Sequence, residues 1–248
     1  MTRPRQPAAD AATLPTGPAV TRLPPGRRPD GRTLFGQTVT VERLDPARHG
    51  HELYASFRRS GEAERMWTYM GYGPFATFGR FRGWLDGLAG CQDPLFHAIR
   101  PLGGPASGMA AYMRITPEHG TIEIGHIWFA PRLRRSRAAT EALWLMMRHA
   151  FADLGNRRLE WKCDALNAAS RAAAERLGFA FEGVFARHMI VKGRNRDTAW
   201  YAITDAEWPA IDRALRTWLD DANFDARGRQ RQALSALMAQ ARAGRTRG

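Results

Sequence analysis

The sequence has only two cysteines and no long apolar run. Cys91 and Cys163 are too few for a disulfide framework and are not spaced as metal ligands, so we expect reduced, buried thiols and no bound metal. No stretch approaches the roughly 20 apolar residues of a membrane helix. The first residues also lack the apolar segment of a secretory signal peptide. These absences predict a soluble, cytoplasmic protein without a membrane partner.

Lysine is also scarce, since Lys162 and Lys192 are the only two and the other 35 basic residues are arginines. The net charge of +13 divides into +4 in residues 1–33, +5 in 225–248 and +4 in 34–224. A basic chain attracts polyanions at low salt. No zinc finger, RNP-type aromatic strand or helix-turn-helix spacing predicts specific nucleic-acid binding, so we expect none. An RNA- or ribosome-associated role for the arginine-rich tails stays open.

The 248 residues are enough for one domain with tails. Seven of the 15 prolines lie in residues 1–33, where apolar periodicity is weak. We therefore expect a disordered Pro/Arg-rich leader, with order beginning near Leu34–Phe35. The central domain spans 34–204, and 205–248 is expected to be a helical C-terminal extension with a basic tail.

Hydrophobic periodicity predicts an α+β fold, with a mostly antiparallel sheet covered by helices. Turn signals at 101–106 and 117–120 make the strands between 95 and 129 antiparallel neighbours. The expected strands are 38–44, 95–100, 107–115, 121–129, 158–163 and two within 181–203, and the expected helices are 51–57, 77–89, 138–154, 170–177, 205–219 and 229–242.

The most informative segment is an arginine-rich loop that opens directly onto the predicted helix 138–154. N–H groups at a helix start are unpaired and carry a partial positive charge, which suits a diphosphate. Arginines in the same loop strengthen such a site. The alternative is that they are simply solvated. The loop arginines are Arg132, Arg134, Arg135 and Arg137.

Several short motifs together resemble those of the GNAT family of acyl-CoA-dependent N-acetyltransferases. The resemblance covers roughly residues 38–204, and it is greatest to the branch that contains the ribosomal-protein N-terminal acetyltransferases. The motifs are Glu123-Ile124-Gly125, the loop Arg134–Ala139, Ala139-Thr140-Glu141-Ala142, Asn167-x-x-Ser170, Leu177-Gly178-Phe179 and Glu182-Gly183.

The resemblance implies that 34–204 is an acyl-CoA N-acetyltransferase domain with helices on both faces of its sheet. Two central parallel strands, 121–129 and 158–163, would splay apart in a V that admits the pantetheine arm of acetyl-CoA. In the family the loop wraps the diphosphate, and here Arg137 stands where a glycine is usual. The backbone N–H of Arg137 would still bind the diphosphate, while its side chain would pair with a phosphate group. For Asn167, capping the next helix and contacting the cofactor stay equally open. The implied cofactor-binding residues are Trp128, Arg132, Arg134, Arg135, Ser136, Arg137, Ala138, Ala139, Thr140, Asn167 and Ser170.

Two residues of the strand 121–129 are candidate catalytic groups, because direct transfer requires a neutral amine. Glu123 matches the acidic residue of the family motif, and a carboxylate among apolar neighbours suits a general base. A salt bridge to an arginine is its alternative role. His126 is the second candidate, with a structural role as its alternative. Strict alternation would place Glu123 on one face with Gly125, Ile127 and Phe129, and His126 on the other with Ile124 and Trp128.

The predicted activity is transfer of an acetyl group from acetyl-CoA to a primary amine, by direct attack in a ternary complex. The acceptor is a peptide or protein N-terminus or a small-molecule amine, and a basic rim disfavours polyamines. The family tyrosine that protonates the thiolate is replaced by Ala174. A non-catalytic CoA-binding module is the alternative, and a homodimer stays open. We expect the acceptor to contact Tyr69, Trp84, Arg187 and His188.

Overall fold

The computed structural model describes residues 14–20, 26–58 and 64–243. Parts of the predicted leader, 1–13 and 21–25, lie outside the described residues. The last five residues of the predicted basic tail, 244–248, lie outside them as well.

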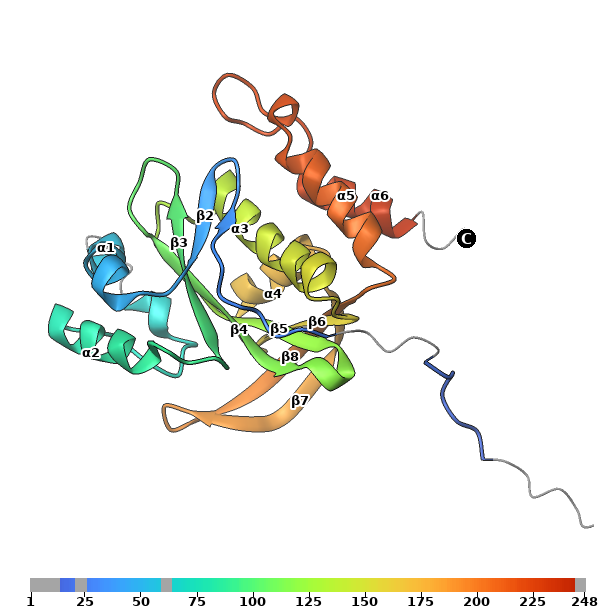
Figure 1. Cartoon of the computed structure of the whole chain (residues 1–248), viewed down its shortest axis with the longest axis horizontal. Coiled ribbons are helices and arrows are strands. Elements are labelled where there is room, and N and C mark those ends of the chain that lie inside the picture. The colour runs from blue at the N-terminus through green and yellow to red at the C-terminus, as the bar shows by residue number, and fades with distance from the viewer. Residues whose placement is uncertain (1–13, 21–25, 59–63, 244–248) are drawn as a thin grey trace, which may run out of the picture.

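A single eight-stranded sheet runs through the molecule in the order β1-β2-β3-β4-β5-β6-β8-β7 (Figure 1). Every neighbouring pair is antiparallel except β5 and β6, which are parallel. The predicted α+β class and its mostly antiparallel sheet are therefore confirmed. The strands are β1 (Leu34–Phe35), β2 (Val39–Arg43), β3 (Leu95–Pro101), β4 (Gly108–Thr116), β5 (Thr121–Phe129), β6 (Arg158–Asp164), β7 (Ala180–Val191) and β8 (Arg194–Thr204).

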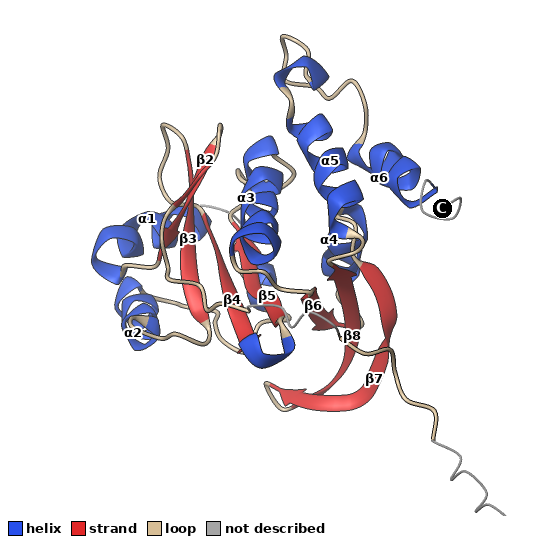
Figure 2. Cartoon of the chain, turned by 45° about the vertical axis from the view of Figure 1, so that its right-hand side comes forward, coloured by secondary structure: helices blue, strands red, loops and turns tan. Residues whose placement is uncertain are grey.

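Helices cover both faces of this sheet, as predicted (Figure 2). On one face, α1 (Pro46–Arg58) and α2 (Phe78–Leu88) enclose a cluster around Phe57, Leu85 and Trp128. On the other, α3 (Arg137–Arg148) and α4 (Ala168–Arg176) pack over Tyr112 and Ile124. The remaining helical elements are the short 3-10 turns η1 (Arg65–Trp67), η2 (Pro117–His119) and η4 (Asp221–Asn223), the π-helical turn η3 (His149–Asp153), α5 (Trp208–Leu219) and α6 (Leu234–Ala243).

The two parallel strands separate soon after they meet. β5 and β6 pair only from Thr121 opposite Arg158 to Glu123 opposite Glu160, although both strands continue beyond these residues. This divergence is the predicted V-shaped splay. It leaves edge backbone groups of both strands facing a gap in the middle of the sheet.

A bulge in β5 changes which side chains share a face. His126 has a φ of 52°, and the pairing with β4 shifts between Gly125 and Trp128. Because the bulge adds one residue, Trp128 lies on the face of Glu123, and Phe129 lies opposite. His126 contacts Phe96 on the face of Glu123, and Ile127 packs with Phe129 on the opposite face. The prediction from strict alternation was therefore correct up to Gly125 and wrong for the four residues from His126 to Phe129.

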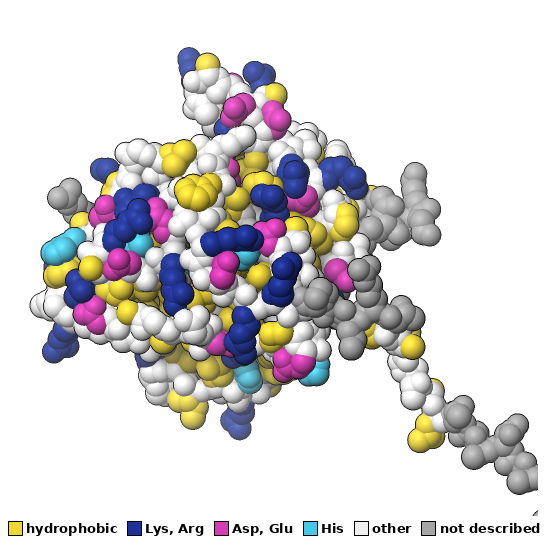
Figure 3. All heavy atoms as spheres, viewed as in Figure 1, with side chains coloured by type: hydrophobic (Ala, Val, Ile, Leu, Met, Phe, Trp, Pro, Cys, Tyr) yellow, Lys and Arg dark blue, Asp and Glu magenta, His cyan; other side chains and the backbone are white. Residues whose placement is uncertain are grey.

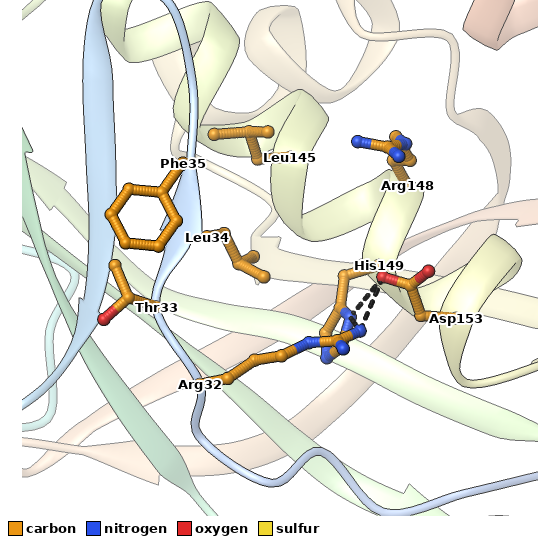
Figure 4. A pocket seen from close by; sticks show the side chains of 8 residues that line it. All are labelled: Arg32, Thr33, Leu34, Phe35, Leu145, Arg148, His149 and Asp153. Carbon is orange, nitrogen blue, oxygen red and sulfur yellow. Dashed lines mark hydrogen bonds and ion pairs between the residues drawn. The ribbon is translucent and has the colours of Figure 1, made fainter.

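The chain makes specific contacts before β1. Arg27 donates its backbone N–H to the Leu154 carbonyl at 3.0 Å, and Arg32 pairs with Asp153 at 2.8 Å. Asp153 also accepts from His149, and these groups line a small pocket at the end of α3 (Figure 4). We expect the ordered part of the chain to begin near Leu34, but Arg27 and Arg32, which precede it, already contact η3 or the residue after it.

The C-terminal extension packs on the domain. The apolar faces of α5 and α6 belong to the same core cluster as α3, with Leu215 completely buried. Trp144 of α3 donates its indole N–H to Asp212 of α5 at 2.8 Å. Within the described ranges, no helix is both long and apolar enough to span a bilayer. On the face in Figure 3, arginines are interspersed with acidic side chains.

Candidate active site

A cleft of about 1450 Å³ follows the gap between β5 and β6. One end lies among residues of η1, of the segment that follows it and of β7, including Tyr69 and His188. The other end lies among the starts of α3 and α4 and the segment that follows α5. Such a long channel can hold an extended molecule with a charged head and a narrow arm.

The start of α3 presents backbone donors to this cleft. Ser136 is the N-cap, and its hydroxyl oxygen accepts the Ala139 N–H at 3.1 Å. Among the described residues, the N–H groups of Arg137 and Ala138 have no acceptor. Two open donors at a helix start form an anion site, and the helix dipole adds to it.

The loop arginines take different positions. Arg134 and Arg135 line the cleft, whereas exposed Arg132 does not. The Nε atom of Arg134 donates to the Phe129 carbonyl at 2.9 Å, and Arg135 adopts a φ of 57° at the turn into the helix. Ala138 packs against the core, while Ser136, Ala139 and Thr140 line the cleft.

The side chain of Arg137 turns toward the C-terminal extension. Its Nη1 atom lies 2.7 Å from the Asp221 carboxylate, and its Nη2 atom donates to the Leu219 carbonyl. Its guanidinium carbon lies 4.7 Å above the Phe224 ring. We expect this side chain to pair with phosphate, but its partners in the structure belong to the protein.

At the start of α4, Asn167 is the N-cap, and its amide oxygen accepts the Ser170 N–H at 3.1 Å. Ser170 in turn accepts the indole N–H of Trp161 at 3.0 Å. Both Asn167 and Ser170 line the cleft. The capping role of Asn167 is thus observed, and its position leaves contact with a ligand open.

The carboxylate of Glu123 lies at the mouth of the gap and is 3% exposed. Its Oε2 atom lies 2.6 Å from Nη1 of Arg114 and 3.2 Å from Nζ of Lys162. The expected salt-bridge alternative is therefore present, and the carboxylate is not among apolar neighbours alone. Its Oε1 atom has no hydrogen-bond partner among the described residues and remains available to a ligand.

Gly125 keeps space open beside that oxygen. A β-carbon on Gly125 would lie 3.3 Å from Oε1 of Glu123 and 2.5 Å from Sδ of Met113. A side chain here would force Met113 to move and would narrow the cleft next to the carboxylate. The Glu-Ile-Gly motif therefore places a carboxylate and an adjoining space together.

His126 enters the cleft from the bulge. Its Nδ1 atom lies 3.3 Å from the hydroxyl oxygen of Tyr72, and the two rings are stacked. Burial lowers the pKa of His126 to about 4, with smaller contributions from Arg114 and Arg196. Burial also raises the pKa of Tyr72. At neutral pH the pair is thus an uncharged imidazole and a phenol.

Two of the four predicted acceptor residues line the cleft. Tyr69 donates its hydroxyl to the Leu166 carbonyl at 3.2 Å, and His188 lies 2.9 Å from the Thr198 hydroxyl. Trp84 does not line the cleft, because it packs behind Tyr72 with ring centres 4.4 Å apart. Arg187 does not line it either, since it has a φ of 52° at a bulge in β7 and is exposed.

Cations dominate the part of the cleft around Glu123. Arg65, Arg114, Lys162 and Arg196 line this part, with Glu123 among them. Within the described chain, the Nε atom of Arg196 is buried without a hydrogen-bond partner. Trp128 also lines the cleft, with its buried indole N–H unpartnered in the same part of the chain. The site therefore carries donors that suit an acidic or carbonyl-rich ligand.

Sequence reasoning missed several residues of the cleft. Lys162 and Arg114, which bind Glu123, come from neighbouring strands, and only their alternation with buried residues could have indicated them. Tyr72 does not line the cleft but contacts His126, which does, and it lies in an aromatic segment without a periodic pattern. Trp218 and Phe224 come from the extension, which local motifs could not connect to the cleft. Ala174 is completely buried, so its position in α4 offers no acid to the cleft.

A split parallel pair of strands, followed by a helix start that can bind a diphosphate, is the arrangement of an acyl-CoA transferase. The family model "Acetyltransferase (GNAT) domain" matches residues 43–180, more than half of the chain. The chain belongs to the GNAT acetyltransferase family, and the resemblance noted from its motifs is confirmed.

Solved structures agree with this assignment. A GCN5-related N-acetyltransferase from Brucella melitensis is 44% identical, with a TM-score of 0.84, covering 87% of this chain and 98% of that chain. A GNAT-family protein from Chromobacterium violaceum ATCC 12472, described as a probable acetyltransferase, is 38% identical, with a TM-score of 0.72, covering 79% and 98%. The protein is therefore an acyltransferase.

One curated relative carries a more specific name. "Putative ribosomal N-acetyltransferase YdaF" of Bacillus subtilis (strain 168) is 29% identical over 105 residues. The match covers 42% of this chain and 57% of the relative, so this chain spans little more than half of that protein's length.

Proposed function

We propose that the protein transfers the acetyl group of acetyl-CoA to the α-amino group of a peptide or protein N-terminus. The observation that carries this proposal is the cleft itself, which joins the open N–H groups of α3 to Glu123 and His126 through the β5–β6 gap. Acetyl-CoA and the acceptor would enter from opposite ends and meet between them.

The residues at the α3 end fit a coenzyme A molecule. The N–H groups of Arg137 and Ala138 would hold the diphosphate, together with the side chains of Arg134 and Arg135. Bound acetyl-CoA supplies an activated thioester. The edge groups of β5 and β6 beyond Glu123 have no partner strand there, so they can bind the amide-containing pantetheine arm.

The transfer forms one C–N bond and breaks one C–S bond. The neutral amine nitrogen attacks the thioester carbonyl and gives up one proton to water, and coenzyme A leaves as a thiolate that takes a proton back from water. A thiol with a pKa of about 8.5 is a tolerable leaving group, so the absence of a tyrosine at Ala174 is compatible with turnover. Oε1 of Glu123 accepts an N–H of the amine and orients it, while Arg114 and Lys162 hold Oε2 in place.

The chemistry of the candidate bases favours an α-amine over a lysine. A lysine amine, with a pKa of about 10.4, is neutral about once in 10³ molecules at pH 7, whereas an α-amine at about 7.7–8.0 is neutral roughly 10–20% of the time. One Glu123 oxygen is occupied by two cations, and burial lowers the pKa of His126 to about 4. A neutral histidine and a carboxylate that already binds two cations suit an acceptor that is itself partly neutral.

Matched peptides test the acceptor. One peptide carries a free N-terminus and no lysine, and the other has the same sequence with a blocked N-terminus and one lysine. We expect acetylation, followed by mass spectrometry and thiol release, on the first alone. Transfer only to the lysine would contradict the proposed acceptor. Coenzyme A binding without transfer to either peptide or to small amines would instead indicate a non-catalytic module.

A further inference from the structure

The C-terminal extension forms part of the cleft wall at its α3–α4 end. Trp218 of α5, together with Phe224 and Gln230 from the segment after η4, lines the same cleft as Thr140 and Arg176. These three residues lie outside the span 43–180 that matches the family model. The wall at the cofactor end of the site therefore comes from a part of the chain that the family model does not include.

Arg137 fixes that wall to the first turn of α3. Its guanidinium pairs with Asp221, donates to the Leu219 carbonyl and lies over the Phe224 ring. Its Nη2 atom also lies 3.2 Å from the side-chain oxygen of Gln37. The Asp221 side chain is 87% exposed and lies outside the core, and its carboxylate reaches the guanidinium from the surface.

The wall combines aromatic rings with a cation that lacks a carboxylate partner. Trp218 and Phe224 pack edge to face at 5.3 Å, and Trp218 donates its indole N–H to Gln230 at 2.8 Å. Arg176 lies 4.9 Å from the Trp218 ring and donates to the Thr140 hydroxyl at 3.2 Å. Within the described part of the chain Arg176 makes no ion pair, and burial lowers its pKa. A half-buried arginine without a counter-charge is a ready partner for a phosphate.

We propose that this wall binds the nucleotide end of coenzyme A. Phe224 and Trp218 contact the purine, Arg176 pairs with the ribose 3′-phosphate, and Arg137 latches the Asp221–Phe224 segment in place. The inference rests on the proposed function. It gives a reason for the arginine at the position where the family usually has glycine: the side chain has a partner in an extension that the family model does not include.

Three ligands of decreasing size test the proposal by calorimetry: coenzyme A, 3′-dephospho-coenzyme A and 4′-phosphopantetheine, the last by displacement where binding is weak. We expect Phe224→Ala to weaken coenzyme A binding about tenfold. Asp221→Ala should weaken it by a smaller factor, up to about fivefold, because the ion pair with Arg137 is exposed. Both variants should bind phosphopantetheine as wild type does. Arg176→Ala should weaken the binding of coenzyme A but not the binding of the 3′-dephospho form. Arg216→Ala, an exposed change on α5 away from the cleft, is the matched control and should bind all three ligands normally.

The outcomes separate this inference from the proposed function. If wild-type protein binds coenzyme A no more tightly than phosphopantetheine, or if Phe224→Ala and Asp221→Ala bind it normally, the wall does not contact the nucleotide. If Asp221→Ala raises the affinity while Arg137→Ala lowers it, Arg137 pairs with phosphate and the latch is wrong. If wild-type protein binds none of the three ligands, the proposed function fails as well.

Discussion

The ammonium nitrogen of Lys162 lies 3.2 Å from Oε2 of Glu123, across the strands whose separation opens the cleft. Lys162 also lies 2.7 Å from Glu160, the residue that pairs with Glu123 at the last rung before the strands diverge. One buried cation therefore holds two carboxylates at the mouth of the gap. Its contact leaves only the Oε1 atom of Glu123 for a substrate.

Glu123→Gln should lower kcat about 100-fold while coenzyme A binding stays unchanged, because the change removes the anionic acceptor and keeps the shape. Steady-state kinetics with an N-terminal peptide and calorimetry with coenzyme A measure the two effects. Glu160→Gln is the control, since Glu160 shares Lys162 but does not line the cleft. An unchanged kcat at neutral pH would remove Glu123 from the mechanism.

The pH profile should follow the substrate and not His126. Because burial lowers the pKa of His126 to about 4, its imidazole is neutral throughout pH 6–9. The value of kcat/KM for an N-terminal peptide should rise with deprotonation of the α-amine, at about 7.7–8.0, without an inflection near 6.5. The profile of His126→Gln should keep this form. An acidic limb near pH 6.5 that disappears in this variant would assign the titrating base to His126 instead.

Much of the fold could be predicted because its signals are local. Apolar residues at helical spacing from Ala138 indicated α3, and the turns at 101–106 and 117–120 indicated the antiparallel strands. The faces of β5 could be predicted only up to Gly125. Nothing in the sequence indicates that His126 adopts a positive φ and adds a bulge.

The site was less predictable where partners are distant in the chain. Arg137 and Asp221 are 84 residues apart, so the loop motif alone could not show where the guanidinium points. A salt bridge between Glu123 and an arginine could be predicted as an alternative role. Which arginine it is, Arg114, follows only from the register of β4 against β5. Spatial contacts of this kind require the assembled sheet.

Gly178→Ala should destabilise the protein by about 1–3 kcal/mol. Gly178 has a φ of 101°, where a non-glycine residue is strained, and a β-carbon there would lie 3.0 Å from Ile211. Gly87→Ala in α2 is the matched control, because no heavy atom lies within 4 Å of the position of its added β-carbon. This change should stabilise the protein by about 0.5–1 kcal/mol. Urea unfolding of both variants measures this difference. Equal effects would contradict the strain at Gly178.

His97 should make the fold sensitive to acid. Burial lowers its pKa from 6.5 to about 4, so the unfolded chain binds its proton more readily. The resulting stability is fully present above pH 6.5 and is lost as the pH falls toward 4. Over this pH window, the free energy of unfolding of His97→Leu should fall by up to about 3 kcal/mol less than that of wild type. Unfolding curves at several pH values check it, with exposed His119→Gln as control; identical slopes for His97→Leu and wild type would refute it.

The central claim is that backbone N–H groups at the start of α3 hold the diphosphate of coenzyme A. Proline is compatible with the first helical position, and Ser136, with φ −91° and ψ 162°, has the conformation that precedes proline. Arg137→Pro therefore removes one N–H group, while Arg137→Ala removes the same side chain and keeps that group. Calorimetric titration with coenzyme A should show binding about tenfold weaker for Arg137→Pro than for Arg137→Ala. Equal affinities, or no binding by wild-type protein, would contradict the claim.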